Sequence, residues 1–127
     1  MNKILFLVVV CSMTLFGDIK WSENYVQGMK EASESGKIMM VMLSKEDCPA
    51  CWYMENVVFE NEAVMKRINA NFINVHLDIH KDNLEGLDFI GTPTIYFLDA
   101  RGQKISRIDG AANVKDFTSA LNALELK

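Results

Sequence analysis

The sequence predicts an α/β fold in which a mixed central β-sheet is flanked by helices, with an extra helix at the N-terminal end of the domain. Residues 38–43 form a continuous apolar run, which is typical of a strand buried on both faces. A helical pattern separates this run from a second strand pattern at 72–78, so these two strands are expected to pair in parallel. Two later strand patterns joined by a tight turn at 100–102 predict an antiparallel pair, which makes the sheet mixed.

Length and composition indicate one globular domain. The chain has 127 residues, and single domains usually hold ~100–200. Hydrophobic residues make up 50% of the chain and charged residues 24%, which is not the composition of a disordered or fibrous protein. With 13 Lys and Arg against 17 Asp and Glu, the net charge of −4 argues against a nucleic-acid partner, because phosphates attract a basic surface.

Residues 1–17 are predicted to be a signal peptide, followed by one domain over residues 18–127. Lys3 precedes a short apolar segment, which is shorter than the ~20 residues that a membrane-spanning helix needs. We therefore expect an exported, periplasmic protein whose cysteines can form disulfides. Two alternatives stay open for this segment, namely an uncleaved membrane anchor and lipid modification at Cys11.

The first half of the domain is expected to contain three helical segments and one strand. Ser22 is the expected cap of a helix that ends at Gly36 and whose apolar stripe comprises Trp21, Tyr25, Val26, Met29 and Ala32. The strand at 38–43 follows. A second helix is expected from 48 to about 59, and Asn61 can cap a continuation with Val64, Met65 and Ile68 facing inward.

The second half is expected to be richer in strands. Alternating and β-branched residues predict the strands 72–78, 94–98 and 103–108. Residues 81–90 are polar and carry weak helical signals. Asn113 can cap a last helix whose apolar face comprises Val114, Phe117, Leu121 and Leu124.

The candidate chemistry lies in the motif Cys48-Pro49-Ala50-Cys51. A spacing of three on a helix places both sulfurs on one face, within reach of a disulfide. Cys48 is expected at the N-cap and Pro49 at the first helical position, where proline costs no hydrogen bond. The positive end of the helix favours a thiolate at Cys48, and Cys51 is placed to resolve the mixed disulfide that this thiolate would form. Such a pair needs no cofactor and no metal.

Other roles for the cysteines are weaker. A purely structural disulfide would add little stability, because the loop that it closes is very short. A zinc site with His76 and His80 fits poorly, since the gap after Cys51 exceeds the ~12–15 residues of the usual pattern. On a strand these two histidines would also lie roughly 13 Å apart. The methionines could suggest a copper site, but a soft apolar core is favoured for Met39, Met40, Met42 and Met54.

The Cys-Pro-Ala-Cys motif at 48–51, after a buried strand, and the Gly-Thr-Pro-Thr motif at 91–94, before another, resemble the thioredoxin superfamily. More narrowly, residues 18–127 are similar to short exported thioredoxin-like proteins and to the C-terminal domain of the DsbD-type thiol:disulfide interchange protein. Further residues that carry this resemblance are Trp21, Gly36, Lys37, Val58, Phe59, Asn61, Ala63, Val64, Asp78 and Gly110. The resemblance implies a thioredoxin fold.

The resemblance also implies how a substrate would bind. Pro93 is expected to be cis, in a loop that packs beside the cysteine pair. Thr92 would offer its backbone groups to an extended substrate, in a form of strand addition. Trp52, directly after the motif, could line the substrate groove or pack against the domain, and these alternatives stay open.

The sequence departs from thioredoxin at two positions near the cysteines. Asp47 replaces the tryptophan before the first cysteine, and Met42 replaces the buried acid that assists proton transfer to and from the second cysteine. Glu46 and Asp47 are expected to lie near Cys48 and to oppose its ionisation. The route of proton transfer is therefore not predicted.

The sequence as a whole predicts an exported thiol–disulfide oxidoreductase with Cys48 as nucleophile and Cys51 as resolving thiol. Pro49 and Ala50 supply no cation that would stabilise a thiolate, so we expect a reductase of periplasmic protein disulfides, with apocytochrome thiols among its candidate substrates. Expected partners are protein disulfides or dithiols and an upstream membrane electron donor, with a monomeric protein. Two alternatives stay open: a copper or zinc chaperone that uses the same thiols, and a redox-inert interaction domain.

Overall fold

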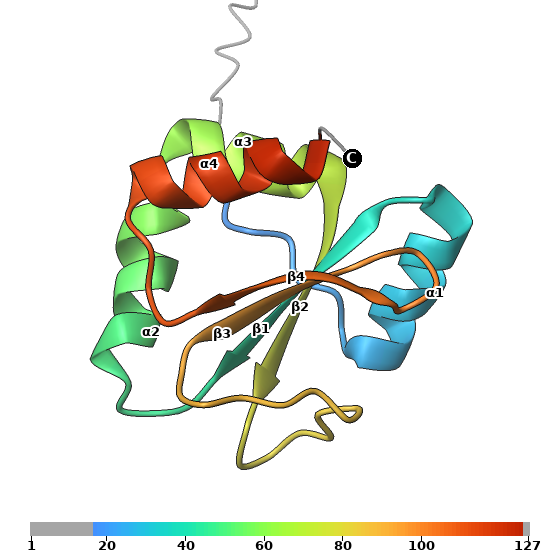
Figure 1. The fold of residues 1–127 in the computed structure, drawn as a ribbon, viewed down its shortest axis with the longest axis horizontal. Coiled ribbons are helices and arrows are strands. Elements are labelled where there is room, and N and C mark those ends of the chain that lie inside the picture. The colour runs from blue at the N-terminus through green and yellow to red at the C-terminus, as the bar shows by residue number, and fades with distance from the viewer. Residues whose placement is uncertain (1–16, 126–127) are drawn as a thin grey trace, which may run out of the picture.

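The central sheet has four strands in the order β2-β1-β3-β4 (Figure 1). The computed structural model describes residues 17–125, so the predicted signal segment lies almost wholly outside the described residues. β1 (Ile38–Ser44) pairs in parallel with β2 (Phe72–Asp78) and antiparallel with β3 (Thr94–Leu98). β4 (Lys104–Asp109) pairs antiparallel with β3, which confirms the predicted mixed sheet. The last strand begins and ends one residue later than the sequence pattern predicted.

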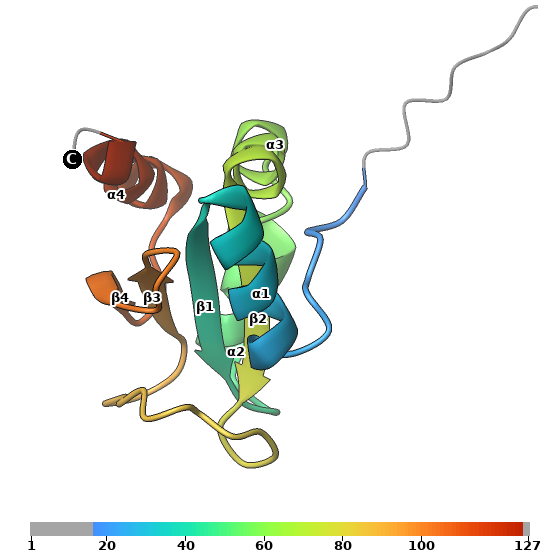
Figure 2. The ribbon, with the colours of Figure 1, turned by 90° about the vertical axis from the view of Figure 1, so that its right-hand side faces the viewer.

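Helices cover both faces of this sheet (Figures 1 and 2). α1 (Tyr25–Ser35) packs with one face, in the buried cluster that contains Ala32, Met39 and Val75. The other face is covered by α2 (Pro49–Tyr53), the π-helical turn η1 (Met54–Val58), α3 (Glu62–Asn71) and α4 (Val114–Glu125). No helix within residues 17–125 is long and apolar enough to cross a membrane.

The predicted start of the first helix is wrong by two residues. Asn24 is the N-cap, and its side chain accepts a hydrogen bond from the Gln27 backbone at 2.8 Å. The Ser22 backbone N–H instead donates to the Asn74 carbonyl of β2 at 2.7 Å, so the chain still runs beside the sheet at this point. Trp21 belongs to this bridging segment rather than to the helix. The predicted end at Gly36 is confirmed, with a φ of 72° that suits glycine.

The helix predicted from 48 to about 59 is divided into α2 and η1. In η1 the Phe59 backbone N–H donates to the Met54 carbonyl at 2.8 Å, which is a π-helical bond. Asn61 then caps α3 as predicted, because its side chain accepts from the Val64 backbone at 3.1 Å.

Residues 81–90 contain turns and no helix, which corrects the weak helical signal there. The Asp78 side chain accepts the backbone N–H of His80 at 2.8 Å, and the Asp82 side chain accepts that of Asp78 at 2.7 Å. Asn83 accepts the backbone N–H of Glu85 in the same way. Short polar side chains thus bind backbone donors at the end of β2 and in the loop that follows it.

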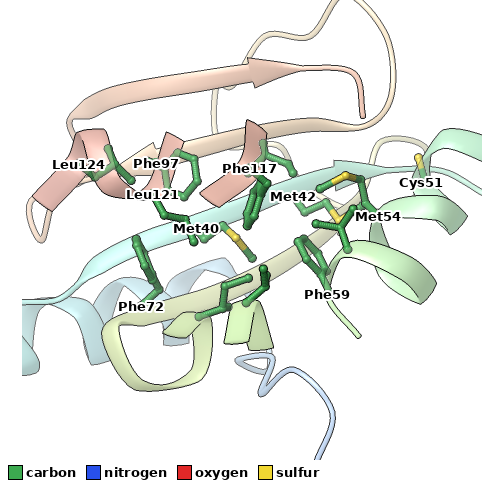
Figure 3. Close-up of a cluster of buried hydrophobic side chains, with 14 residues drawn as sticks. Met40, Met42, Cys51, Met54, Phe59, Phe72, Phe97, Phe117, Leu121 and Leu124 are labelled. Atoms are coloured by element: carbon green, nitrogen blue, oxygen red, sulfur yellow. The ribbon is translucent and has the colours of Figure 1, made fainter. Parts of the chain in front are cut away.

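The core on the α2, α3 and α4 side of the sheet reaches the cysteine motif (Figure 3). Met40, Met42 and Met54 are fully buried in this cluster, and Cys51 is only 2% exposed. Met39 is fully buried on the opposite side. The prediction that these methionines form a soft core is confirmed.

Candidate active site

Cys48 and Cys51 form a disulfide at the start of α2, where the chain leaves β1. Their Cα atoms lie 5.2 Å apart. Cys48 is the N-cap, and its Sγ accepts the backbone N–H of Cys51 at 3.2 Å. Pro49 occupies the first turn, as predicted. The helix end therefore points a backbone donor at the first sulfur, whereas the second sulfur lies inside the domain.

A second segment, 44 residues further along the chain, completes the surroundings of Cys48. The Thr92 hydroxyl donates to the Cys48 Sγ at 3.4 Å, and the Thr92 carbonyl oxygen lies 3.6 Å from the same sulfur. The Thr92–Pro93 peptide bond is cis, as the resemblance implied. The Gly110 backbone donates to the Pro93 carbonyl at 2.8 Å and the Thr94 hydroxyl to the Gly91 carbonyl at 2.7 Å, so both sides of the loop are anchored.

A pocket of about 560 Å³ opens at the disulfide and is lined by Lys45, Asp47, Cys48, Pro49, Cys51, Trp52 and Glu55. Trp52 is 61% exposed, so its ring is available to a partner rather than packed in the core. Ile90, next to the loop with the cis peptide bond, is 83% exposed. Apolar side chains that face solvent beside a reactive pair are suited to contact another protein.

The two acids before Cys48 differ in their surroundings. Asp47 lines the cysteine pocket and has a φ of 54°, a conformation that aspartate adopts more readily than most residues. Glu46 instead pairs with Lys81, which lies in the loop after β2. The hydrogen bond from Lys81 to Glu46 and the negative charge of Glu46 raise the pKa of the Lys81 ammonium. The expectation that both acids oppose the ionisation of Cys48 stays a prediction, and the Glu46 carboxylate is the one that another side chain engages.

Glu55 and His76 are site residues that the sequence analysis did not assign. The His76 Nε2 lies 2.7 Å from the Glu55 Oε1, and the Trp21 ring meets the imidazole edge to face at 5.4 Å between centroids. A partial signal was present, because Glu55 follows Cys51 by one helical turn. The position of His76 depends on the pairing of β1 with β2, which the sequence pattern alone does not specify to the residue.

The zinc arrangement weighed from the sequence is not assembled. His76 engages Glu55, while His80 lies in the turn after β2. Within residues 17–125, no three His, Cys, Asp or Glu side chains are grouped so that they could hold a metal ion.

Comparison with known proteins agrees with this architecture. The family model of the thioredoxin-like domain matches residues 25–125. DsbD, the thiol:disulfide interchange protein of Yersinia enterocolitica, is 32% identical over 101 residues, which are 73% of this chain and 17% of that protein. Anterior gradient protein 3 of Mus musculus is 31% identical over 84 residues, which are 65% of this chain and 50% of that protein.

Among solved structures, a thioredoxin from Thermus thermophilus has a TM-score of 0.74 with this chain at 23% identity. The superposition covers 85% of this chain and 88% of the thioredoxin, so the likeness extends over the whole fold. Because the family model spans nearly all of the described residues, this chain belongs to the thioredoxin-like domain family.

Proposed function

We propose that the protein is a thiol–disulfide oxidoreductase. The observation that carries this proposal is the Cys48–Cys51 disulfide at a helix N-terminus, directly beside the Thr92–Pro93 loop. A disulfide that closes so short a loop contributes little to stability, so its position at a helix N-terminus and at a pocket supports chemistry rather than a structural role.

In the reduced protein, the Cys48 thiolate would attack one sulfur of a substrate disulfide. A mixed disulfide forms and the first substrate thiolate leaves. Cys51 then gives up its proton and attacks the Cys48 Sγ, so that the Cys48–Cys51 bond forms and the second substrate thiolate leaves. Two electrons pass to the substrate, and its two thiolates take up two protons: one matches the proton released by Cys51, and the other comes from solvent.

The groove at the disulfide supports a protein substrate. The Thr92 backbone lies beside the first sulfur, where an extended segment could add to it as a strand does. Trp52 and the neighbouring Pro93 loop would contact the residues that flank the substrate cysteine. The scheme needs no cofactor, because the two sulfurs carry the electrons.

We further propose that residues 1–17 direct export and that the protein acts as a reductase in the periplasm. The similarity to DsbD supports a place in disulfide exchange and an upstream membrane donor for the electrons. Pro49 and Ala50 bring no cation to the sulfurs, which favours a potential nearer the about −270 mV of thioredoxin than the about −120 mV of a strong oxidant. Equilibration with glutathione measures this potential, and a value near the oxidising limit would contradict the direction of electron flow.

Insulin reduction in the presence of dithiothreitol tests the activity, with metal content measured on the same sample. We expect turnover that depends on both cysteines and that proceeds without stoichiometric metal. Stoichiometric copper or zinc with no turnover would identify a metal chaperone instead. A protein with neither property would be a redox-inert interaction domain.

A further inference from the structure

Glu55 and His76 form a carboxylate–imidazole pair one helical turn beyond Cys51. Glu55 comes from η1 and His76 from the middle of β2, and the two side chains are 37% and 35% exposed. Their Oε1 and Nε2 atoms lie 2.7 Å apart, which is a short hydrogen bond. The exchange scheme above leaves this pair without a role.

Glu55 connects this pair with the cysteines. Its side chain lines the cysteine pocket together with Cys51, and it also lines a second pocket of about 650 Å³ that contains Trp21 and His76. Glu55 therefore borders both pockets, whereas His76 lines only the second of them.

Cys51 needs a proton acceptor because its surroundings are apolar. The side chain is 2% exposed and packs in the cluster that contains Met42 and Met54 (Figure 3). A thiol must lose its proton before it attacks, and burial disfavours the thiolate that results. Met42 cannot take that proton, although it pairs with His76 in the register of β1 and β2. The neighbouring strand β2 thus carries a polar side chain, His76, opposite the apolar Met42.

We propose that Glu55 and His76 are the proton-exchange pair for Cys51, with Glu55 as the group that exchanges the proton and His76 as a positioning residue. This inference rests on the proposed function. In the resolving step the Cys51 proton passes to the Glu55 carboxylate, directly or through water, while Cys51 attacks the Cys48 Sγ and the substrate thiolate leaves. Solvent or that thiolate then takes the proton from Glu55, which restores the carboxylate.

His76 is itself held by the segment that precedes α1. Trp21 packs against the imidazole at 5.4 Å and against Phe59 at 6.1 Å between ring centroids. The Asn74 side chain donates to the Lys20 carbonyl at 3.3 Å, which fixes this segment beside β2. Trp21, which itself packs on Phe59, and the strand that carries His76 thus restrict the orientation of the imidazole, and a restricted imidazole keeps Glu55 in place.

Other charged groups also line these two pockets. Their effects on the rates must be distinguished from those of Glu55 and His76 in any pH experiment. Asp18 and Glu60 line the pocket on the Trp21 side, and Lys45 and Asp47 line the cysteine pocket. Glu60 provides a matched control, because it carries the same charge in the same pocket but has no part in the hydrogen bond between Glu55 and His76.

The test uses the reduced protein and one equivalent of Ellman's reagent, an aromatic disulfide. Attack by Cys48 releases the first thionitrobenzoate, and attack by Cys51 on the resulting mixed disulfide releases the second. The second release is intramolecular, so its rate should not depend on the concentration of the reagent. Stopped-flow absorbance therefore measures the two steps separately on one sample.

We expect Glu55→Gln to slow the second release about tenfold or more at neutral pH and to leave the first release within about twofold. The difference should shrink as the pH rises, because hydroxide then removes the Cys51 proton. A purely electrostatic role predicts the opposite sign, since the loss of a negative charge would favour the Cys51 thiolate and speed the step.

His76→Leu should also slow the second release, whereas His76→Gln should restore part of the rate because its amide can donate to Glu55. Glu60→Gln should leave both steps unchanged. The inference is overturned if Glu55→Gln behaves like Glu60→Gln, or if His76→Gln is as slow as His76→Leu. A second release that depends on reagent concentration in the wild-type protein would instead show that the cysteines do not resolve one another, and the proposed function itself would fail.

Discussion

The surroundings of the two cysteines contrast sharply although only two residues separate them. Cys48 lies at the helix end, where a backbone N–H and the Thr92 hydroxyl both point at its sulfur. Cys51 lies one turn further in and is buried among Met42, Met54 and other apolar side chains. The surroundings of the Cys48 sulfur favour a thiolate, whereas those of the Cys51 sulfur favour a neutral thiol. The difference agrees with the proposed roles, in which Cys48 attacks and Cys51 needs a nearby proton acceptor.

The largest expected effect comes from removing either of the two sulfurs. Cys48→Ser should abolish insulin reduction, and Cys51→Ser should abolish turnover but accumulate mixed disulfides through Cys48. In the reduced wild-type protein, iodoacetamide should modify Cys48 about a hundredfold or more faster than Cys51, because reaction needs an accessible thiolate. Peptide mass spectrometry identifies the modified residue, and a partner found on Cys51 would reverse the assignment.

An acid introduced near Cys51 should supply the proton acceptor that its apolar surroundings lack. Met42→Asp replaces a fully buried thioether with a carboxyl group, and we expect the free energy of unfolding to fall by about 2–4 kcal/mol. In a Glu55→Gln background the same change should recover part of the slowed second step, because a new proton acceptor lies at the sulfur. Urea unfolding and stopped-flow measurements provide the two quantities.

Met42→Leu is the matched control for that substitution. It keeps the volume and the apolar character of the site, so its cost should stay below about 1.5 kcal/mol. No recovery of the second step is expected from it. Equal recovery by the leucine variant would show that packing rather than proton exchange limits Cys51.

Removal of one polar contact should make Cys48 less reactive. Thr92→Val keeps the side-chain shape but deletes the hydroxyl that donates to the Cys48 Sγ at 3.4 Å. A hydrogen bond of about 1 kcal/mol corresponds to roughly a fivefold slower alkylation of Cys48 at mildly acidic pH. Thr92→Ser should react like the wild-type protein, and a serine variant as slow as the valine variant would contradict the role of the hydroxyl.

The smallest effect is expected at the exposed pair of Glu46 and Lys81. Glu46 raises the pKa of the Lys81 ammonium, so the pair stabilises the folded state below the ordinary lysine pKa and loses this contribution as the pH rises through the raised value. Both side chains are exposed, so Glu46→Gln should change neither the unfolding midpoint at neutral pH nor the alkylation rate of Cys48 measurably. A clear change in the alkylation rate would show that Glu46 acts on the sulfur after all.

Local patterns predicted most elements because their causes are local. The apolar run of β1, the Asn61 cap and the Gly36 terminus each depend on a few neighbouring residues, and each is confirmed. The errors had two causes. Ser22 does not cap α1 because its backbone pairs with the distant Asn74. Residues 81–90 stay in turns because short polar side chains bind nearby backbone donors, a local competition with helix formation.

The sequence by itself determined the redox motif and its place at the start of a helix, because both follow from the spacing of two cysteines and a proline. The resemblance carried by residues 91–94 added the cis loop beside them. Only the tertiary structure decided the contact of Thr92 with Cys48, the pairing of Glu55 with His76 and the packing of Trp21 on the imidazole. These contacts join residues that are far apart in the chain, and their geometry depends on strand register and on how the helices pack, which no local pattern specifies.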